Sequence, residues 1–142
     1  MNQSNRSTPT IEPLLTLTIQ TRLVRTVGGT PLGERTVFDI AGGTFEGPGL
    51  RGQVLASGGD WLIRTAAGSQ LDVRLLLETD DGVTILFRYA GKASQRTGHA
   101  RIEIAGGFEA PDGLYGWLNQ VQAFGLGERA PDGIRYHLFR FS

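Results

Sequence analysis

The sequence predicts an all-β protein, a single-domain antiparallel β-barrel of about eight to ten strands. Three observations predict it. Apolar and polar residues alternate along most of the chain, breaker-rich turns separate the alternating segments, and no window of helical length carries an apolar stripe. We favour a barrel over an open sheet because closure removes the exposed edges that an open sheet must protect.

Nine segments carry the strand pattern. The first spans 15–23, where Leu15, Leu17 and Ile19 alternate with polar residues, as expected of a strand with one buried face. The remaining strands are predicted at 35–41, 50–56, 60–66, 70–79, 83–90, 99–106, 115–125 and 133–141.

Glycine and proline mark the connections between these segments. Residues 28–33 and 42–49 are rich in glycine, which in strand patterns marks turns, bulges and sharp bends. Residues 79–82 read Thr-Asp-Asp-Gly, and Asp-Gly is a strong hairpin signal. Residues 110–113 and 130–133 are both Ala-Pro-Asp-Gly, which we interpret as reuse of favourable turn chemistry.

Length and composition restrict the organisation and the class of protein. At 142 residues the chain has the length of one domain. We expect a flexible N-terminal tail over 1–13 and the barrel over 14–142. The tail lacks the apolar core of a secretory signal, and no apolar run is long enough for a membrane helix. We therefore expect a soluble, cytoplasmic protein without a membrane partner.

The charge balance, the lack of cysteine and the residues that follow one glycine-rich segment argue against several functions. Fourteen basic residues balance 14 acidic ones, which argues against a nucleic-acid partner. The absence of cysteine excludes disulfides, thiolate metal sites and cysteine nucleophiles. The glycines at 28–33 are not followed by the Lys-Ser/Thr of a phosphate-binding loop. We expect neither a metal nor an organic cofactor.

The charged face of two predicted strands allows two interpretations. In segment 70–79, Asp72, Arg74 and Glu78 share the face opposite the apolar residues, and Arg88 occupies the same kind of position in the next strand. These residues either form a solvated outer face with cross-strand ion pairs, or line the lumen of a barrel whose apolar row packs against a partner.

Two groups of residues are candidates for a pocket. Two glycines precede Asp60 and Trp61, which form either a turn with a core indole or part of a pocket. Tyr115, Trp117 and Asn119 alternate along one predicted strand face, as expected of a pocket wall made of flat rings with polar groups.

An ordered series of motifs then runs along residues 14–141. It comprises Gly28-x-Thr30-Pro31-x-Gly33-x-Arg35, Gly42-Gly43-Thr44, Gly47-Pro48-x-Leu50-x-Gly52-x-Val54-Leu55, Gly58-Gly59-Asp60-Trp61, Leu71-Asp72-x-Arg74, Thr79-Asp80-Asp81-Gly82, Phe108-Glu109 and Tyr115-x-Trp117-Leu118-Asn119. The series resembles domain-of-unknown-function family 3237, small bacterial and fungal β-barrel proteins. The resemblance implies a closed or nearly closed antiparallel barrel that self-associates, so we expect a homo-oligomer. Some fungal relatives look like cofactor-free cyclases that add a hydroxyl across an alkene.

The leading hypothesis is a cofactor-independent isomerase, lyase or cyclase acting on an apolar hydroxylated or carbonyl-bearing small molecule. Asp60 is the expected general base, Arg74 the group that binds a developing oxyanion, and Tyr115 the general acid or hydrogen-bond donor. The expected substrate-binding residues are Trp61, Thr79, Asp80, Arg88, Trp117 and Asn119.

Two alternatives use the same residues differently. The chain could be a non-catalytic carrier or sensor of a small apolar ligand, which needs the aromatic residues but not the Asp60 and Arg74 pair. It could also be a structural or interaction protein whose charged row faces water. Exposure of Arg74 to solvent would favour this last reading.

Overall fold

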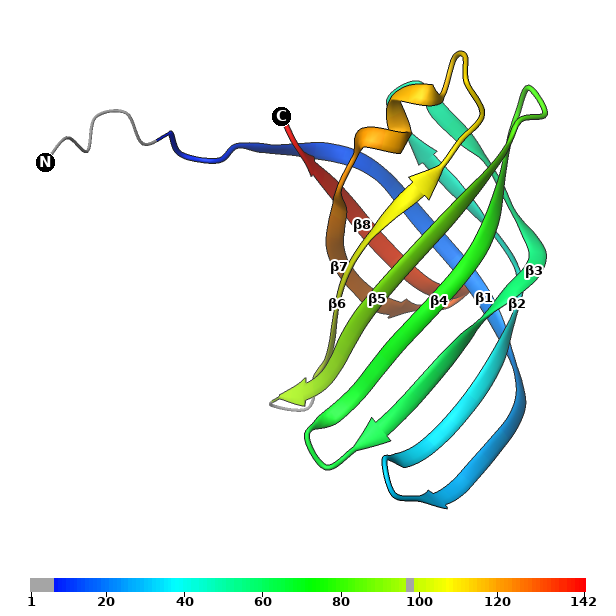
Figure 1. Ribbon diagram of the computed structural model, residues 1–142, viewed down its shortest axis with the longest axis vertical. Helices are drawn as coiled ribbons and strands as arrows, with labels where there is room; N and C mark the ends of the chain where they lie inside the picture. The colour runs from blue at the N-terminus through cyan, green and yellow to red at the C-terminus, as the bar shows by residue number, and fades with distance from the viewer. Residues whose placement is uncertain (1–6, 97–98) are drawn as a thin grey trace, which may run out of the picture.

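The computed structural model describes residues 7–96 and 99–142, with side chains described outside 95–100. Eight strands form a closed antiparallel barrel in chain order, and the last strand pairs back onto the first (Figure 1). The predicted all-β barrel is confirmed, with eight strands. The elements are β1 Ile11–Thr30, β2 Gly33–Gly47, β3 Leu50–Thr65, β4 Gly68–Thr79, β5 Thr84–Arg96, β6 His99–Glu109, the 3₁₀ helix η1 Gly116–Gln120, β7 Ala123–Ala130 and β8 Gly133–Phe141.

Two predicted segments, 50–56 and 60–66, form the single long strand β3. The strand continues through a bulge. Between Val54 and Gly58 it carries three residues where β4 carries one. Gly58 has a φ of 92°, and a Cβ there would lie 2.1 Å from the carbonyl oxygen of Arg74. Only glycine fits this position. The sequence pattern suggested that this glycine belongs to a turn between two strands, but it forms a bend within one continuous strand.

The strand predicted over 115–125 is wrong in its first half, where the chain forms η1. Tyr115, Leu118 and Val121 are buried, and their spacing of three is the period of a 3₁₀ helix rather than a strand. In Figure 1 this segment covers one end of the barrel, and the Leu118 side chain is fully buried there. Among the described residues no helix is long and apolar enough to cross a membrane.

The barrel interior is filled with apolar side chains. The residues of β4 that face inward include Val73 and Leu77, both fully buried, and the rings of Phe87 and Phe108 stack at 4.5 Å between centroids. A barrel of eight strands is just wide enough for its side chains to fill it. The interpretation that the charged row lines the lumen is therefore wrong.

Two inward-facing tyrosines fit because glycines lie beside them. Tyr89 is the register partner of Gly106, where a Cβ would lie 2.6 Å from the Tyr89 Cβ. Tyr136 is the partner of Gly127, where a Cβ would lie 2.5 Å from the ring. The missing side chains on β6 and β7 give the rings their space, and this places two phenols deep inside the barrel.

Candidate functional site

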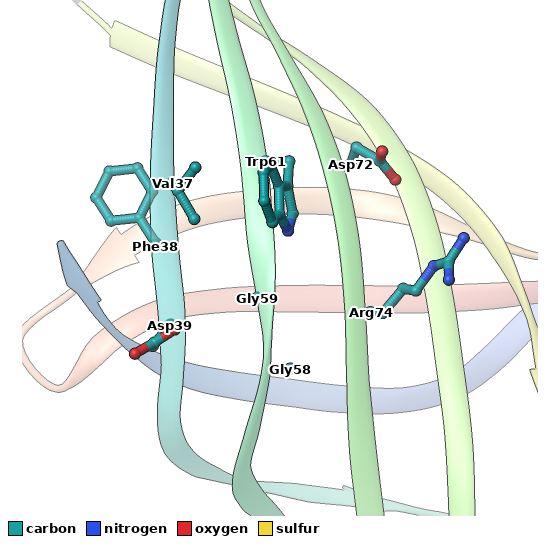
Figure 2. A pocket seen from close by; sticks show the side chains of 8 residues that line it. All are labelled: Val37, Phe38, Asp39, Gly58, Gly59, Trp61, Asp72 and Arg74. Carbon is teal, nitrogen blue, oxygen red and sulfur yellow. The ribbon is translucent and has the colours of Figure 1, made fainter. Parts of the chain in front are cut away.

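A hollow of about 510 Å³ lies on the outer surface of the barrel, across β2, β3 and β4 (Figure 2). We call it the outer groove. It gathers an exposed indole, a guanidinium, two carboxylates and a stretch of bare backbone. Its lining residues are Val37, Phe38, Asp39, Gly58, Gly59, Trp61, Asp72 and Arg74.

The strand register explains how the indole reaches the outer groove. Trp61 points outward with 56% of its surface exposed, and its register partner on β2 is Val37. A Cβ on Gly59 would lie 3.8 Å from the indole Nε1, so the indole sits beside backbone that carries no side chain. The Arg35 guanidinium donates a 2.8 Å hydrogen bond to the backbone carbonyl of Trp61, and this bond links β2 to β3.

One charged residue of the outer groove forms an ion pair and two do not. Asp39 accepts a 2.7 Å hydrogen bond from Arg22 in an exposed ion pair. Asp72 and Arg74 form no ion pair with each other or with any other residue of the described part of the chain. Figure 2 shows both side chains projecting from β4 toward the side away from Trp61, which lies on β3. The guanidinium of Arg74 is therefore free to receive an anionic or carbonyl oxygen.

Arg88 is exposed and is the register partner of Arg74 on β5, but it does not line the outer groove. Both guanidinium groups therefore lie on the outside of the barrel, as expected if the charged row faces water, and this exposure favours the reading of a structural or interaction protein. The sequence reading expected the two arginines in one pocket with Asp60. The structure brings only Arg74 to the groove.

Asp60 lies on the other side of the wall from its neighbour Trp61. Its register partners are Phe38 and Val73, and only 8% of the residue is exposed. One carboxylate oxygen, Oδ1, accepts a 3.3 Å hydrogen bond from the backbone N–H of Asp72. Burial raises the pKa of Asp60 to about 6, and the nearby charge of Asp72 acts in the same direction.

The groups that share the interior with Asp60 are two phenols. The rings of Tyr89 and Tyr136 meet edge to face with centroids 5.4 Å apart. The buried hydroxyl of Tyr89 has no hydrogen-bond partner among the residues described. Burial raises the pKa of Tyr89 well above its usual value and that of Tyr136 to about 12, and the charge of Asp60 contributes to both increases.

Sequence reasoning did not identify these tyrosines as site residues. The sequence signal for them is a tyrosine in a row of inward-facing residues that are otherwise apolar, paired with a glycine on the neighbouring strand. That signal becomes readable only when the register is known.

Tyr115 belongs to a hydrogen-bonded cluster at the end of the barrel covered by η1. Its hydroxyl donates to Asp81 Oδ1 at 2.7 Å, and the Thr79 hydroxyl donates to the same oxygen at 2.5 Å. The backbone N–H of Val83 donates to Thr79 Oγ1 at 2.9 Å. The hydrogen bonds from Thr79 and Tyr115 lower the pKa of Asp81, and the bond to Asp81 raises that of Tyr115. The cluster joins the β4–β5 turn to the segment that precedes η1.

The remaining predicted site residues lie at the same end. Asn119 exchanges two hydrogen bonds, of 2.8 and 2.9 Å, with the backbone of Ala110. Asp80 forms an exposed ion pair with Arg51 at 2.9 Å. The guanidinium of Arg140 lies 5.3 Å from the centroid of the Trp117 ring.

The structure does not bring the expected catalytic trio together. Asp60 is the register partner of Val73 on β4. Tyr115 donates a hydrogen bond to Asp81, in the turn that follows Thr79, and Thr79 lies six residues beyond Val73 along β4. At about 3.3 Å per residue this separation is about 20 Å. Arg74 lies on the outer surface, opposite in direction to Asp60. A single pocket holding Asp60, Arg74 and Tyr115 is therefore contradicted by the fold.

Comparison with known proteins identifies relatives of the whole barrel. The family described as "Protein of unknown function (DUF3237)" matches residues 9–141. The UPF0311 protein RPA1785 of Rhodopseudomonas palustris is 36% identical over 87 residues, which are 59% of this chain and 57% of that protein. The matched segment thus spans a little over half the length of that relative.

Solved structures share the fold over nearly the full length. A β-barrel-like protein from Acinetobacter baumannii is 29% identical with a TM-score of 0.90, covering 99% of this chain and 100% of that one. A protein described as an enzyme from Penicillium herquei is 19% identical with a TM-score of 0.76, covering 99% and 100%, and is alike in fold. With a family match that covers nearly all of the barrel, this chain belongs to the DUF3237 family of proteins of unknown function.

Proposed function

We propose that the protein binds a small organic molecule in the outer groove, with a ring on Trp61 and an anionic or carbonyl oxygen on Arg74. One observation carries the proposal: an exposed indole, a guanidinium without an ion-pair partner and bare glycine backbone line the same hollow. An exposed indole offers a flat apolar face and an unpaired guanidinium offers a cation with a planar fork, so the two together suit a ligand that carries a ring and an oxygen group.

The dimensions and chemistry of the outer groove define the ligand class. Its volume of about 510 Å³ falls in the range of small-molecule sites. The planar fork of Arg74 matches a carboxylate or a carbonyl, and the Asp72 carboxylate can accept a hydrogen bond from a hydroxyl. The best candidate is a flat molecule that carries both a hydroxyl group and a carboxylate or carbonyl.

Tryptophan fluorescence tests this binding directly. The chain has two tryptophans, so Trp117→Phe leaves Trp61 as the sole indole. We expect hydroxylated aromatic carboxylates to change the emission of this variant with saturation, and the matching amides to bind more weakly. Adding Arg74→Met should weaken binding of the carboxylates at least about tenfold, whereas Arg88→Met, on the neighbouring strand, should not.

The opposite pattern would reject the site. Equal loss of binding in the Arg74 and Arg88 variants would indicate a general effect of surface charge. No saturable change with any hydroxylated aromatic carboxylate would remove the proposed ligand class.

A second candidate is cofactor-independent proton transfer at Asp60, which requires a substrate to reach the interior side of the wall, because the Asp60 carboxyl does not line the outer groove. A carboxyl whose pKa is about 6 can accept and return a proton near neutral pH. Isomerisation, cyclisation by addition of a hydroxyl across a double bond, and elimination need no co-substrate when the proton removed from one atom is returned to another. Tyr89 and Tyr136, buried phenols whose pKa values the charge of Asp60 raises, take the place of the expected Tyr115 as candidate proton donors. The description of the Penicillium herquei neighbour as an enzyme agrees with this candidate at the level of the fold.

Product analysis with a bound ligand separates the two candidates. A carrier or sensor returns its ligand unchanged, and Asp60→Asn leaves the affinity unaltered. An enzyme gives an isomeric or cyclised product, and Asp60→Asn lowers turnover at least about 100-fold while Arg88→Met does not. Wild-type turnover by a folded Asp60→Asn protein would exclude Asp60 as the base.

A further inference from the structure

A second hollow adjoins the outer groove on the outside of the barrel. It measures about 350 Å³ and lies across β1, β2 and β3. Asp39 and Gly58 line both hollows, so the two share a border. We call the second one the side hollow. Its other lining residues include Arg22, Ala56 and Ser57, which are all exposed. Because a ligand in the outer groove lies beside this space, the two hollows can hold different parts of one molecule.

One wall of the side hollow is the bulge in β3. Leu55, Ala56 and Ser57 have no register partner on β2 or β4 within the described sheet, and residues 40–42 of β2 have none on β3. Residues of a bulge that are left out of the ladder keep backbone N–H and C=O groups for other partners. The exposed Ser57 adds a hydroxyl that both donates and accepts. The side hollow therefore offers hydrogen bonds beside the apolar surface of Ala56.

The two hollows differ in charge. In the side hollow, Arg22 and Asp39 form an ion pair of 2.7 Å, with 74% and 46% of their side chains exposed. The pair carries no net charge, and each partner keeps further donors or acceptors. It therefore suits an uncharged polar group such as a hydroxyl or an amide. In the outer groove, Arg74 has no ion-pair partner in the described part of the chain, so that end suits an anion.

The spacing of these charged groups exceeds the length of a single ring. Asp39, Gly59 and Arg74 are successive register partners on β2, β3 and β4. At about 4.8 Å between neighbouring strands, the backbones of Asp39 and Arg74 are about 10 Å apart. Figure 2 shows their side chains on opposite sides of Gly58 and Gly59. One benzene ring with its substituents is shorter than this, so a ligand that reaches both groups needs a longer skeleton.

We propose that one elongated ligand occupies both hollows. Its anionic end binds Arg74, and its flat body crosses the bare backbone of Gly58 and Gly59. Its far end places a hydroxyl or amide group beside the ion pair of the side hollow. The ligand class is thus a two-ring or ring-and-chain molecule with a carboxylate at one end and an uncharged polar group at the other. This inference rests on the proposed function, because it extends the same site.

Titration calorimetry with matched ligands tests the two-hollow site. The probes are para-hydroxybenzoate and its biphenyl analogue, which carries the hydroxyl and the carboxylate at opposite ends. We expect the biphenyl to bind the wild type at least about tenfold more tightly. Ala56→Phe fills the side hollow and should remove this advantage, while the affinity for para-hydroxybenzoate stays within about twofold. Ala105→Phe makes the same replacement at an exposed strand position outside both hollows and should leave both affinities unchanged.

A second variant controls for a local effect of Ala56→Phe on the bulge. Ser57→Leu narrows the side hollow from the neighbouring residue and should cause the same selective loss of the biphenyl. A biphenyl advantage that survives both variants, or that is missing in the wild type, would overturn the proposal. Para-hydroxybenzoate separates this failure from that of the outer groove. If Arg74→Met still weakens its binding, the proposed function stands without the side hollow, and if Arg74→Met has no effect, both fall.

Discussion

Asp60 and Trp61 are consecutive residues of β3, and the barrel wall separates their side chains. The carboxyl group is buried on the interior side, where its charge raises the pKa of Tyr89 and Tyr136, whereas the indole lies in the outer groove with 56% of its surface exposed. Successive side chains of a strand point to opposite faces, so one motif supplies two different environments.

Stability should depend on pH through Asp60. Burial raises its pKa from 3.8 to about 6, so the folded state binds a proton more tightly than the unfolded chain. The associated stability is fully present below about pH 4 and is lost as the pH rises through about 6, an effect on the order of 3 kcal/mol. Asp60→Asn should flatten this dependence and stabilise the protein at pH 7. Urea unfolding at pH 4, 6 and 8 measures it, and a variant with the wild-type pH profile would contradict the assignment.

Trp61→Ala should leave the fold almost unchanged. An indole this exposed contributes little to the core, so we expect the free energy of unfolding to change by less than about 0.5 kcal/mol. Leu118→Ala is the comparison, since that side chain is fully buried under η1 and its loss should cost about 2 to 5 kcal/mol. A large destabilisation by Trp61→Ala would mean that the indole serves packing rather than a ligand.

Tyr115→Phe should weaken the fold without affecting the outer groove. The substitution removes the 2.7 Å hydrogen bond to Asp81, and we expect a loss of about 1 kcal/mol in the free energy of unfolding. Ligand-induced fluorescence of Trp61 should keep its wild-type midpoint because the two places are about 20 Å apart. Lower turnover in a Tyr115→Phe protein of normal stability would restore Tyr115 as a catalytic residue.

Gly106→Ala should be far more harmful than the same change one residue later. A Cβ on Gly106 would lie 2.1 Å from the carbonyl oxygen of Arg88 and 2.6 Å from the Cβ of Tyr89. On Gly107 the nearest atom would be 4.0 Å away. We expect a cost of about 2 to 4 kcal/mol for Gly106→Ala and less than about 1 kcal/mol for Gly107→Ala. Denaturant unfolding of the pair checks the difference, and equal costs would show that the space beside Tyr89 is not limiting.

The amino-acid sequence by itself determined the class of structure. Alternation, as in Leu15 to Ile19, and glycine-rich turns predicted the strands and the closed barrel, and the motif series pointed to the family. The same alternation could not reveal η1. Tyr115, Trp117 and Asn119 occupy every second position, as on a strand face, whereas the residues that are buried there lie three apart.

Only the tertiary structure decided which face of each strand is inside and which residues meet. Period two divides a strand into two faces without saying which one is buried, and that choice depends on how much volume eight strands enclose. The interior has room for the apolar row of β4, so Arg74 must face water. The approach of Asp60 to Tyr89 and Tyr136 depends on the register of strands far apart in the chain, and no local pattern in the sequence contains that information.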